Sequence, residues 1–223
     1  MATRAQLSQE RSRQRRELLL AAAIELFAEG GSRAVTHRAV AAAAGLPPAS
    51  TTYYFESIEE LLRAALADHV ARWRHELDQL SGLESMPRAH ISVDEATTVI
   101  GQVFAARGPD VAARELSILL AVARDDALRD EARATLEGFE ELAARWLAIL
   151  GVPDGERVAP TMLALVAGTA LRRQSGQYSE QEEARMLSEG LRDLVGAHLQ
   201  GREAIDQVIE STIAAATERD AGA

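Results

Sequence analysis

The chain has 223 residues, 47% of them hydrophobic, so it can bury a substantial core in one or two domains without disulfide or metal staples. It contains no cysteine, which excludes disulfides, thiolate metal sites and cysteine nucleophiles. The net charge of -10 taken alone disfavours a nucleic-acid partner, and the absence of long apolar runs or a leader pattern predicts no membrane span, no secretory signal and a cytoplasmic location.

The charge is unevenly distributed along the chain. Residues 1–55 carry seven arginines against four glutamates, a net +3, whereas the remaining residues carry -13. Such asymmetry indicates that one segment faces a polyanion while the rest faces something else.

Helical periodicity runs through nearly every segment, and no run alternates as a strand would, so we predict an all-α fold. A first helix spans about 11–30, with Leu20, Ala23, Ile24 and Phe27 on one face, and ends at a glycine pair. Thr36 caps a short helix that Gly45 ends, and a second short helix follows Pro47 and Pro48 and closes at Phe55. The remaining helices are expected at about 57–80, 94–106, 110–123, 127–150, 156–174, 180–199 and 203–218, with capping boxes at Ser57/Glu60 and Ser92/Glu95.

Two short helices joined by a tight glycine turn have the geometry of a helix-turn-helix, whose second helix lies in the major groove of DNA. Ala41 to Ala44 are small enough to let the two helices cross closely. The same pattern also suits an alanine-rich helical hairpin inside a bundle, so spacing alone leaves both interpretations open.

The residues themselves add a resemblance. Val35-Thr36-His37-Arg38-Ala39-Val40-Ala41-Ala42-Ala43-Ala44-Gly45-Leu46, then Ser50, Tyr53-Tyr54-Phe55 and Glu59-Glu60-Leu61-Leu62, are similar to the N-terminal signature of TetR-type regulators. The resemblance covers about 55 residues and implies an N-terminal three-helix helix-turn-helix domain, residues 1–56, followed by a helical ligand-binding and dimerisation domain, residues 57–223. It departs from the family pattern at Ala49 and Thr52, where glycine and tyrosine are common, and at Pro48 and Ile58, where a basic residue is common.

Carried over position by position, the resemblance predicts the contacts to a double-stranded DNA operator. Thr36 contacts the DNA backbone at the start of the first short helix, and Arg38, next to His37, reaches guanine or a phosphate. An arm of arginines near the N-terminus reaches phosphates or the minor groove. One tyrosine of the pair binds a phosphate while the other ring packs inside, and Phe55 is expected in the core. The predicted DNA-binding residues are Arg11, Arg13, Arg15, Thr36, His37, Arg38, Pro47, Pro48, Ala49, Ser50, Thr51, Tyr53 and Tyr54.

The resemblance also implies a small-molecule effector of unknown identity and a homodimer through the helices around 156–175 and 180–199. Their apolar stripes, Val158, Met162, Leu165 and Thr169 on one helix and Leu187, Leu191, Leu194 and His198 on the other, would equally serve a bundle within one chain. The predicted ligand-binding residues are Trp73, Gln102, Phe104, Arg107, Glu115, Trp146 and Met162.

Enzymatic interpretations find no support in the motifs. The chain has no G-x-S-x-G, no G-x-G-x-x-G and, since it lacks lysine, no P-loop. None of its five histidines follows a glutamate by three residues, which disfavours a helical di-iron site, so we expect no cofactor, metal or catalytic residue. The alternative function is a non-enzymatic helical interaction module whose basic arm binds an acidic partner.

Overall fold

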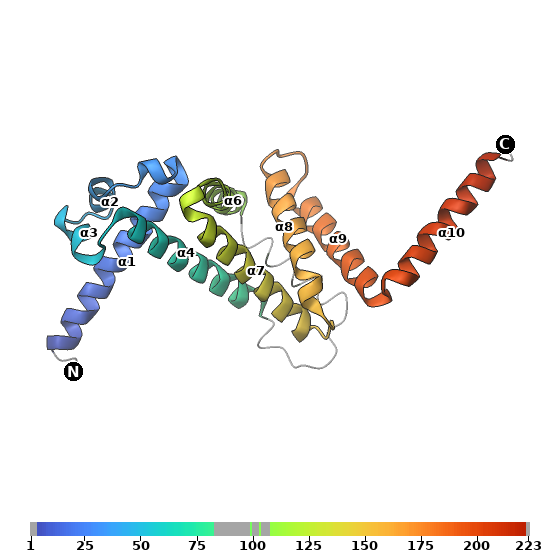
Figure 1. The fold of residues 1–223 in the computed structure, drawn as a ribbon, viewed down its shortest axis with the longest axis horizontal. Helices are drawn as coiled ribbons and strands as arrows, with labels where there is room; N and C mark the ends of the chain where they lie inside the picture. Colours follow the sequence, from blue (N-terminus) through green and yellow to red (C-terminus); the bar gives the residue numbers. More distant parts are fainter. Residues whose placement is uncertain (1–3, 83–98, 100–102, 104–107, 222–223) are drawn as a thin grey trace. The chain divides into compact units, whose positions relative to one another are not determined.

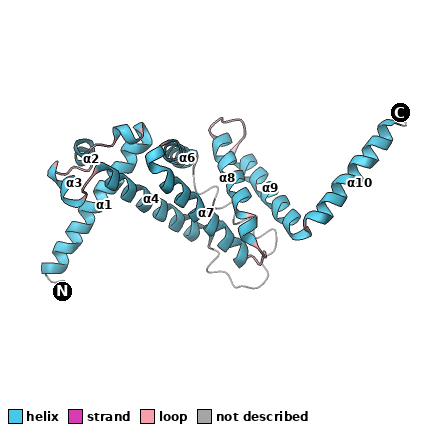
Figure 2. Ribbon diagram, in the orientation of Figure 1, coloured by secondary structure: helices cyan, strands magenta, loops and turns pink. Residues whose placement is uncertain are grey.

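The structure is a computed structural model that describes residues 4–82, 99, 103 and 108–221. Within these residues every regular element is helical, which confirms the all-α prediction (Figure 2). The helix expected at 94–106, with its capping box at Ser92 and Glu95, lies outside the described residues apart from positions 99 and 103.

The helices fall close to their predicted ranges (Figure 1). They are α1 (Arg4–Gly30), α2 (His37–Ala43), α3 (Ala49–Tyr54), α4 (Ile58–Ser81), α6 (Pro109–Arg124), α7 (Arg129–Ile149), α8 (Ala159–Arg173), α9 (Glu180–Gln200) and α10 (Arg202–Ala221). Single 3-10 turns occur at Ser32–Ala34, Asp126–Leu128 and Gly155–Arg157. The first helix begins seven residues earlier than predicted, because no proline or glycine interrupts the chain before Arg11.

The chain divides into two compact units, one within 1–79 and 107–139 and the other within 80–106 and 140–223. The first unit therefore joins α1 to α4 with α6 and the start of α7. The predicted division at residue 56 remains a prediction.

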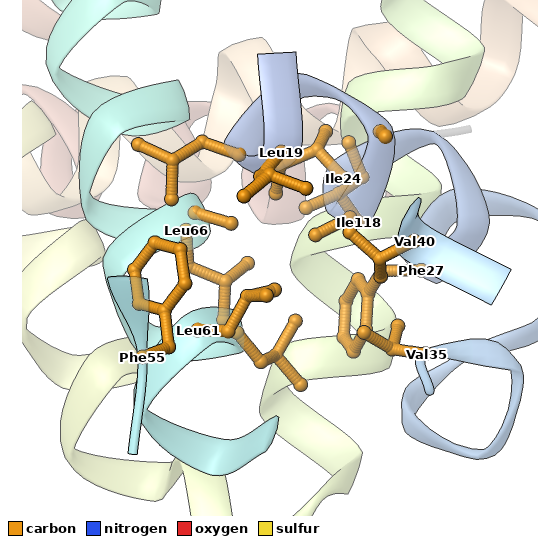
Figure 3. Packing of buried hydrophobic residues seen from close by; sticks show 14 of the residues in the cluster. Leu19, Ile24, Phe27, Val35, Val40, Phe55, Leu61, Leu66 and Ile118 are labelled. Atoms are coloured by element: carbon orange, nitrogen blue, oxygen red, sulfur yellow. The ribbon is translucent and has the colours of Figure 1, made fainter. Parts of the chain in front are cut away.

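The core of the first unit is built from side chains of α1, α2, α4 and α6 (Figure 3). On α1 the predicted face is confirmed, and Leu19 joins it; on α4 the face falls on Leu61, Leu62, Ala65 and Leu66, at the i, i+3 and i+4 spacings of a helix. The side chains that meet there include Leu19, Leu20, Ile24, Phe27, Val35, Val40, Phe55, Leu61, Leu66, Ile118 and Val122. Burial of each large side chain contributes about 1.5–3 kcal/mol, so this shared core holds the short helices α2 and α3 in place.

The start of α4 is capped, with one difference from the predicted box. The backbone N–H of Glu60 donates to Ser57 Oγ at 3.1 Å as expected, but the Glu60 carboxylate accepts from the backbone N–H of Glu56 at 2.7 Å and not from that of Ser57. The Glu60 carboxylate thus reaches one residue further back than in a capping box, and it still satisfies a backbone N–H group that precedes the helix.

The second unit contains a hairpin of α8 and α9. Ser179 and Glu182 form a reciprocal capping box at the start of α9. Arg172 on α8 binds the buried carboxylate of Glu183 through Nε and Nη2 at 2.7–2.9 Å. A planar, bidentate pair of this kind fixes the register of the two helices.

Candidate functional site

The first short helix begins at a threonine cap. Thr36 has extended backbone angles, and its Oγ1 accepts a hydrogen bond from the backbone N–H of Ala39 at 3.2 Å. The predicted cap is confirmed. Arg38, the second residue of the helix, is exposed and forms no ion pair with a described residue, while His37 is half-buried. Thr36 and Arg38 therefore present polar groups to solvent at the same end of α2.

The turn between α2 and α3 depends on one glycine. Gly45 has a φ of 65°, in the left-handed region, and its N–H bonds to the carbonyl of Ala42 while the N–H of Leu46 bonds to that of Ala41. A side chain would be strained at this φ, so glycine sets the crossing of the two helices. Of the alanines predicted to allow that crossing, Ala41 is buried, but Ala42 and Ala43 are exposed and do not contribute to it.

The second short helix turns an uncharged face outward. Pro47, Pro48 and Ala49 are exposed at its start, and Ser50 is half-buried. Thr51 is fully buried, and its hydroxyl donates to the carbonyl of Pro48 at 3.1 Å. The helical rotation thus points the Thr51 side chain into the core, and this conformation lends no support to its predicted DNA contact, which stays a prediction. Thr52, noted in the sequence only as a departure from the family pattern, is exposed.

The two tyrosines at the end of α3 have different environments. The ring of Tyr53 is 79% exposed, whereas Tyr54 is half-buried, and its hydroxyl lies 3.2 Å from Ser12 Oγ on α1. Phe55 is buried as predicted, with the guanidinium of Arg16 5.4 Å from its ring centroid. Ser12 and Arg16 thus fasten the first half of α1 to the end of α3, a role that their sequence positions did not reveal.

The arginine arm is a helix with two different sides. Arg13 binds Glu10 at 2.7 Å and Glu17 at 3.7 Å, and the hydrogen bond that its guanidinium donates to the Glu10 carboxylate raises the pKa of Arg13. Arg11 and Arg15, four residues apart and exposed, form no ion pair with a described residue. The positive charge of Arg13 is offset, while that of Arg11 and Arg15 is not.

The start of α4 is acidic. Glu59 and Glu60 are exposed there, and hydrogen bonds from the backbone N–H of Glu59 and from Ser57 lower the pKa of Glu59. These negative charges stabilise the N-terminus of α4, but they cannot bind a DNA phosphate. Cations of the described head, residues 4–56, therefore come from α1, the 3-10 turn at Ser32–Ala34 and α2.

Comparisons with known proteins agree with this architecture. Residues 19–65 match the profile of the bacterial regulatory proteins of the tetR family, and residues 91–201 match that of the tetracyclin repressor-like C-terminal domain. The chain belongs to the TetR family. The two matches lie on either side of most of α4 and together account for the helix-turn-helix and the helical domain that follows it.

Individual relatives share most of their length with this TetR-family chain. The HTH-type transcriptional regulator BetI of Rhizobium meliloti is 27% identical over 190 residues, which cover 83% of this chain and 89% of BetI. A TetR-family protein of Streptomyces coelicolor is 27% identical, with a TM-score of 0.57, over 78% of this chain and 96% of that one. The multidrug binding protein EbrR, crystallised with imidazole, is 28% identical, with a TM-score of 0.56, over 78% and 93%. The chain is thus a TetR-family transcriptional regulator, a family whose members are generally not enzymes.

The first unit of the regulator also contains a cavity of about 420 Å³ between α1, α4 and α6. Trp73 and Glu115, both predicted ligand-binding residues, line it. Trp73 packs edge-on against Phe139 at 4.4 Å between ring centroids, and Glu115 is only 6% exposed. Of the other predicted residues, Gln102, Phe104 and Arg107 lie outside the described residues, and Trp146 and Met162 are half-buried in the second unit and do not line this cavity.

Most side chains of the predicted dimer stripes on α8 and α9 pack inside this chain. Leu187, Leu191, Val158 and Thr169 are buried, and His198 Nε2 lies 2.8 Å from the carbonyl of Pro153. Leu165 of the predicted α8 stripe is 37% exposed, however, and together with Leu171, which is 60% exposed, it leaves apolar surface on α8 open to solvent. Gly168 lies between them on this surface, and a side chain there would meet no atom within 4 Å.

Two negative findings complete the site. The described residues contain no group of three or more histidine, aspartate or glutamate side chains placed to hold a metal ion. None of the helices that the structure describes has the length and apolar character needed to cross a membrane.

Proposed function

We propose that this TetR-family regulator binds a pseudo-palindromic DNA operator as a homodimer, represses transcription there, and is released by a small-molecule effector. The observation that carries the proposal is the exposed polar edge of α2 beside the uncharged face of α3, held by the Gly45 turn. Residues 1–56 form the DNA-binding domain in this proposal, and residues 57–223 bind the effector and dimerise.

The residues at the start of α3 read the bases in the major groove. Pro47, Pro48 and Ala49 offer apolar surface to thymine methyl groups, and the Ser50 hydroxyl reaches a base edge. Arg38 is placed to bind guanine O6 and N7 from the neighbouring helix. Because the face of α3 is uncharged, its recognition depends on shape and methyl contacts.

Phosphate contacts surround that face. The exposed hydroxyl of Tyr53 donates to a phosphate, while Tyr54 positions α1 through Ser12. Thr36 and His37 anchor the start of α2. On α1, Arg11 and Arg15 bind phosphates, and Arg13 contributes little because Glu10 and Glu17 already compensate its charge.

Dimerisation uses α8 and α9. The exposed face of α8, which carries Leu165, Gly168 and Leu171, is suited to pack against its copy across a two-fold axis, with Gly168 permitting close approach. Two reading helices would then reach half-sites about 34–36 Å apart, or a near multiple of that spacing.

Support for an effector comes from the cavity and from one relative. The 420 Å³ volume falls within the range of about 300–1,000 Å³ that small-molecule sites occupy. EbrR, a multidrug binding protein, binds imidazole in its crystal structure. A ligand releases DNA only if it binds the DNA-free conformation more tightly than the DNA-bound one.

The experiment is selection of bound duplexes from a random DNA library by the full chain, followed by titration of the selected duplex. We expect a two-fold symmetric consensus, with each mismatch in a half-site costing about 1–3 kcal/mol. Arg38→Ala should weaken binding while leaving the dimer intact, and Arg133→Ala, a matched exposed arginine on α7, should not.

Binding that depends on salt but is indifferent to sequence would contradict the proposal. It would favour the alternative function, an interaction module whose basic arm binds an acidic partner. Unchanged affinity of the Arg38 variant would remove that residue from the interface.

A further inference from the structure

The helix α10 carries apolar side chains along a side that is open to solvent. Val208 is 61% exposed and Ile209 is 50% exposed, and Ile213, one turn further along, is exposed as well. Ile205, one turn before them, is half-buried. The i, i+3, i+4 and i+8 spacing places these four side chains on one stripe of the helix. Large apolar side chains are common singly on a protein surface, but a continuous stripe of them indicates a contact with another molecule.

The corner before α10 directs this helix away from its own chain. Gly201 ends α9 with a φ of 83°, a conformation that favours glycine. Figure 1 shows α10 leaving α9 at this corner. Within the part of the chain that the structure describes, α10 packs chiefly against α9. Because most of the stability of a helix in a protein comes from packing its apolar face, the exposed stripe leaves α10 with a favourable contact still to make.

The helix α10 also lies outside the fold that the family shares. The profile of the tetracyclin repressor-like C-terminal domain ends at residue 201, directly before α10. The structures of EbrR and of the Streptomyces coelicolor protein each match 78% of this chain, but 93% and 96% of their own length. This chain therefore has residues that these relatives lack, and α10 is an addition to the common architecture.

The area that a stable dimer needs favours a second copy as the partner of α10. A specific interface buries about 800 Å² on each partner, contributed by about 20–30 residues. Most apolar residues of the α8 and α9 stripes are already buried within the chain, and the large exposed ones on α8 are Leu165, Val166 and Leu171. Three such side chains are few for an interface of that size. Leu199, exposed in the last turn of α9, extends the exposed apolar surface of the second unit to the start of α10.

We propose that α10 is an arm that packs its apolar stripe against a second copy of this chain and so enlarges the dimer interface. The inference rests on the proposed function in so far as that function includes a homodimer. A two-fold axis repeats the arm, so the dimer gains two such contacts. The other side of the helix carries Glu203, Asp206 and Glu210, which are exposed and remain in water, since burial of unpaired carboxylates is costly.

Sedimentation equilibrium of the full chain, without DNA or effector, tests the arm through the dissociation constant of the dimer. Val208→Gln together with Ile209→Gln removes two apolar side chains from each copy and keeps a good helix former at both positions. We expect the dissociation constant to rise about a hundredfold. Gln207→Ala together with Ser211→Ala, at two exposed positions on the opposite side of α10, is the matched control and should leave the dissociation constant unchanged.

A second measurement locates the contact without altering the stripe. The chain has no cysteine, so Thr212→Cys, at an exposed position beside Val208 and Ile209 on the helix surface, can carry a single environment-sensitive fluorophore. Its emission should shift to the blue as the protein concentration is raised through the dissociation constant of the dimer. The emission of the same fluorophore on Gln207→Cys, on the opposite side of α10, should not shift.

An unchanged dissociation constant of the stripe variant, or a Thr212 label whose emission does not follow dimerisation, would overturn the proposal. A label that is already blue-shifted in the monomer would place the stripe against its own chain, and one that shifts only with phosphatidylcholine vesicles would assign it to a membrane surface; both results would also overturn it. If the full chain dimerises and the stripe variant equals it, the arm alone is refuted. If the full chain stays monomeric at every concentration, the homodimer of the proposed function is refuted as well.

Discussion

Replacing Arg11 and Arg15 together by glutamine tests the division of charge along α1. Both side chains are exposed and without ion pairs among the described residues, so in the complex each is free to neutralise one phosphate. Glutamine has nearly the helix propensity of arginine, and the substitution should therefore leave α1 folded. The expected loss is electrostatic and should appear in the salt dependence of operator binding.

The magnitude follows from the number of contacts. Two arginines in each of two subunits make four phosphate contacts, and each contributes about 0.9 to the slope of log affinity against log salt concentration. The double variant should lower the magnitude of that slope by about 3.6. Between 50 and 200 mM salt, wild-type affinity should then fall about 150-fold more than that of the variant.

The assay is fluorescence anisotropy with a labelled operator at five or more salt concentrations. Arg13→Gln is the control: it removes one positive charge from the same helix, but from a residue that Glu10 and Glu17 already bind. Its slope should equal that of the wild type. Equal reductions by the control and the double variant would refute the reasoning that ion pairs within the helix decide which arginines reach DNA.

Four further predictions concern the fold and the dimer. Gly45→Val should lower the free energy of unfolding by about 1–2 kcal/mol in thermal denaturation, because its φ of 65° is left-handed, and Gly45→Asn should recover most of that loss; equal effects would contradict the argument from φ. Gly168→Trp should yield a folded monomer in analytical ultracentrifugation, since a large side chain there meets open space within the chain but blocks a partner, and a persistent dimer would locate the interface elsewhere. Ser179→Ala should cost about 1 kcal/mol through loss of the α9 cap. The Ser179 N–H and hydroxyl donate hydrogen bonds to the Glu182 carboxylate and lower its pKa. The carboxylate therefore stabilises the folded chain above the ordinary glutamate pKa, and this stabilisation is lost as the pH falls through the lowered value. Glu182→Gln should remove that part of the pH dependence of the free energy of unfolding, and an unaltered acid profile would contradict the assignment.

Much of the fold could be predicted from local signals. Thr36 and Gly45 mark the ends of α2, and the spacing of Leu20, Ile24 and Phe27 marks the buried face of α1, because caps and periodicity act within a few residues. The burial of Thr51 was missed. In a helix of only six residues, a rotation of one position exchanges inside for outside, and the sequence pattern is too short to define it.

By itself the sequence determined the helical class, the order of the helices and the location of the helix-turn-helix, since these follow from local backbone preferences and from a short, specific motif. Tertiary structure decided which side chains remain available. It compensated Arg13 and left Arg11 and Arg15 exposed, turned Thr51 inward and Tyr53 outward, and gathered carboxylates from α1, α4 and α6 around one cavity. Each of these outcomes depends on how helix faces meet across the core, and residues such as Glu25 and Arg114, 89 positions apart, give no sign of their contact in the sequence.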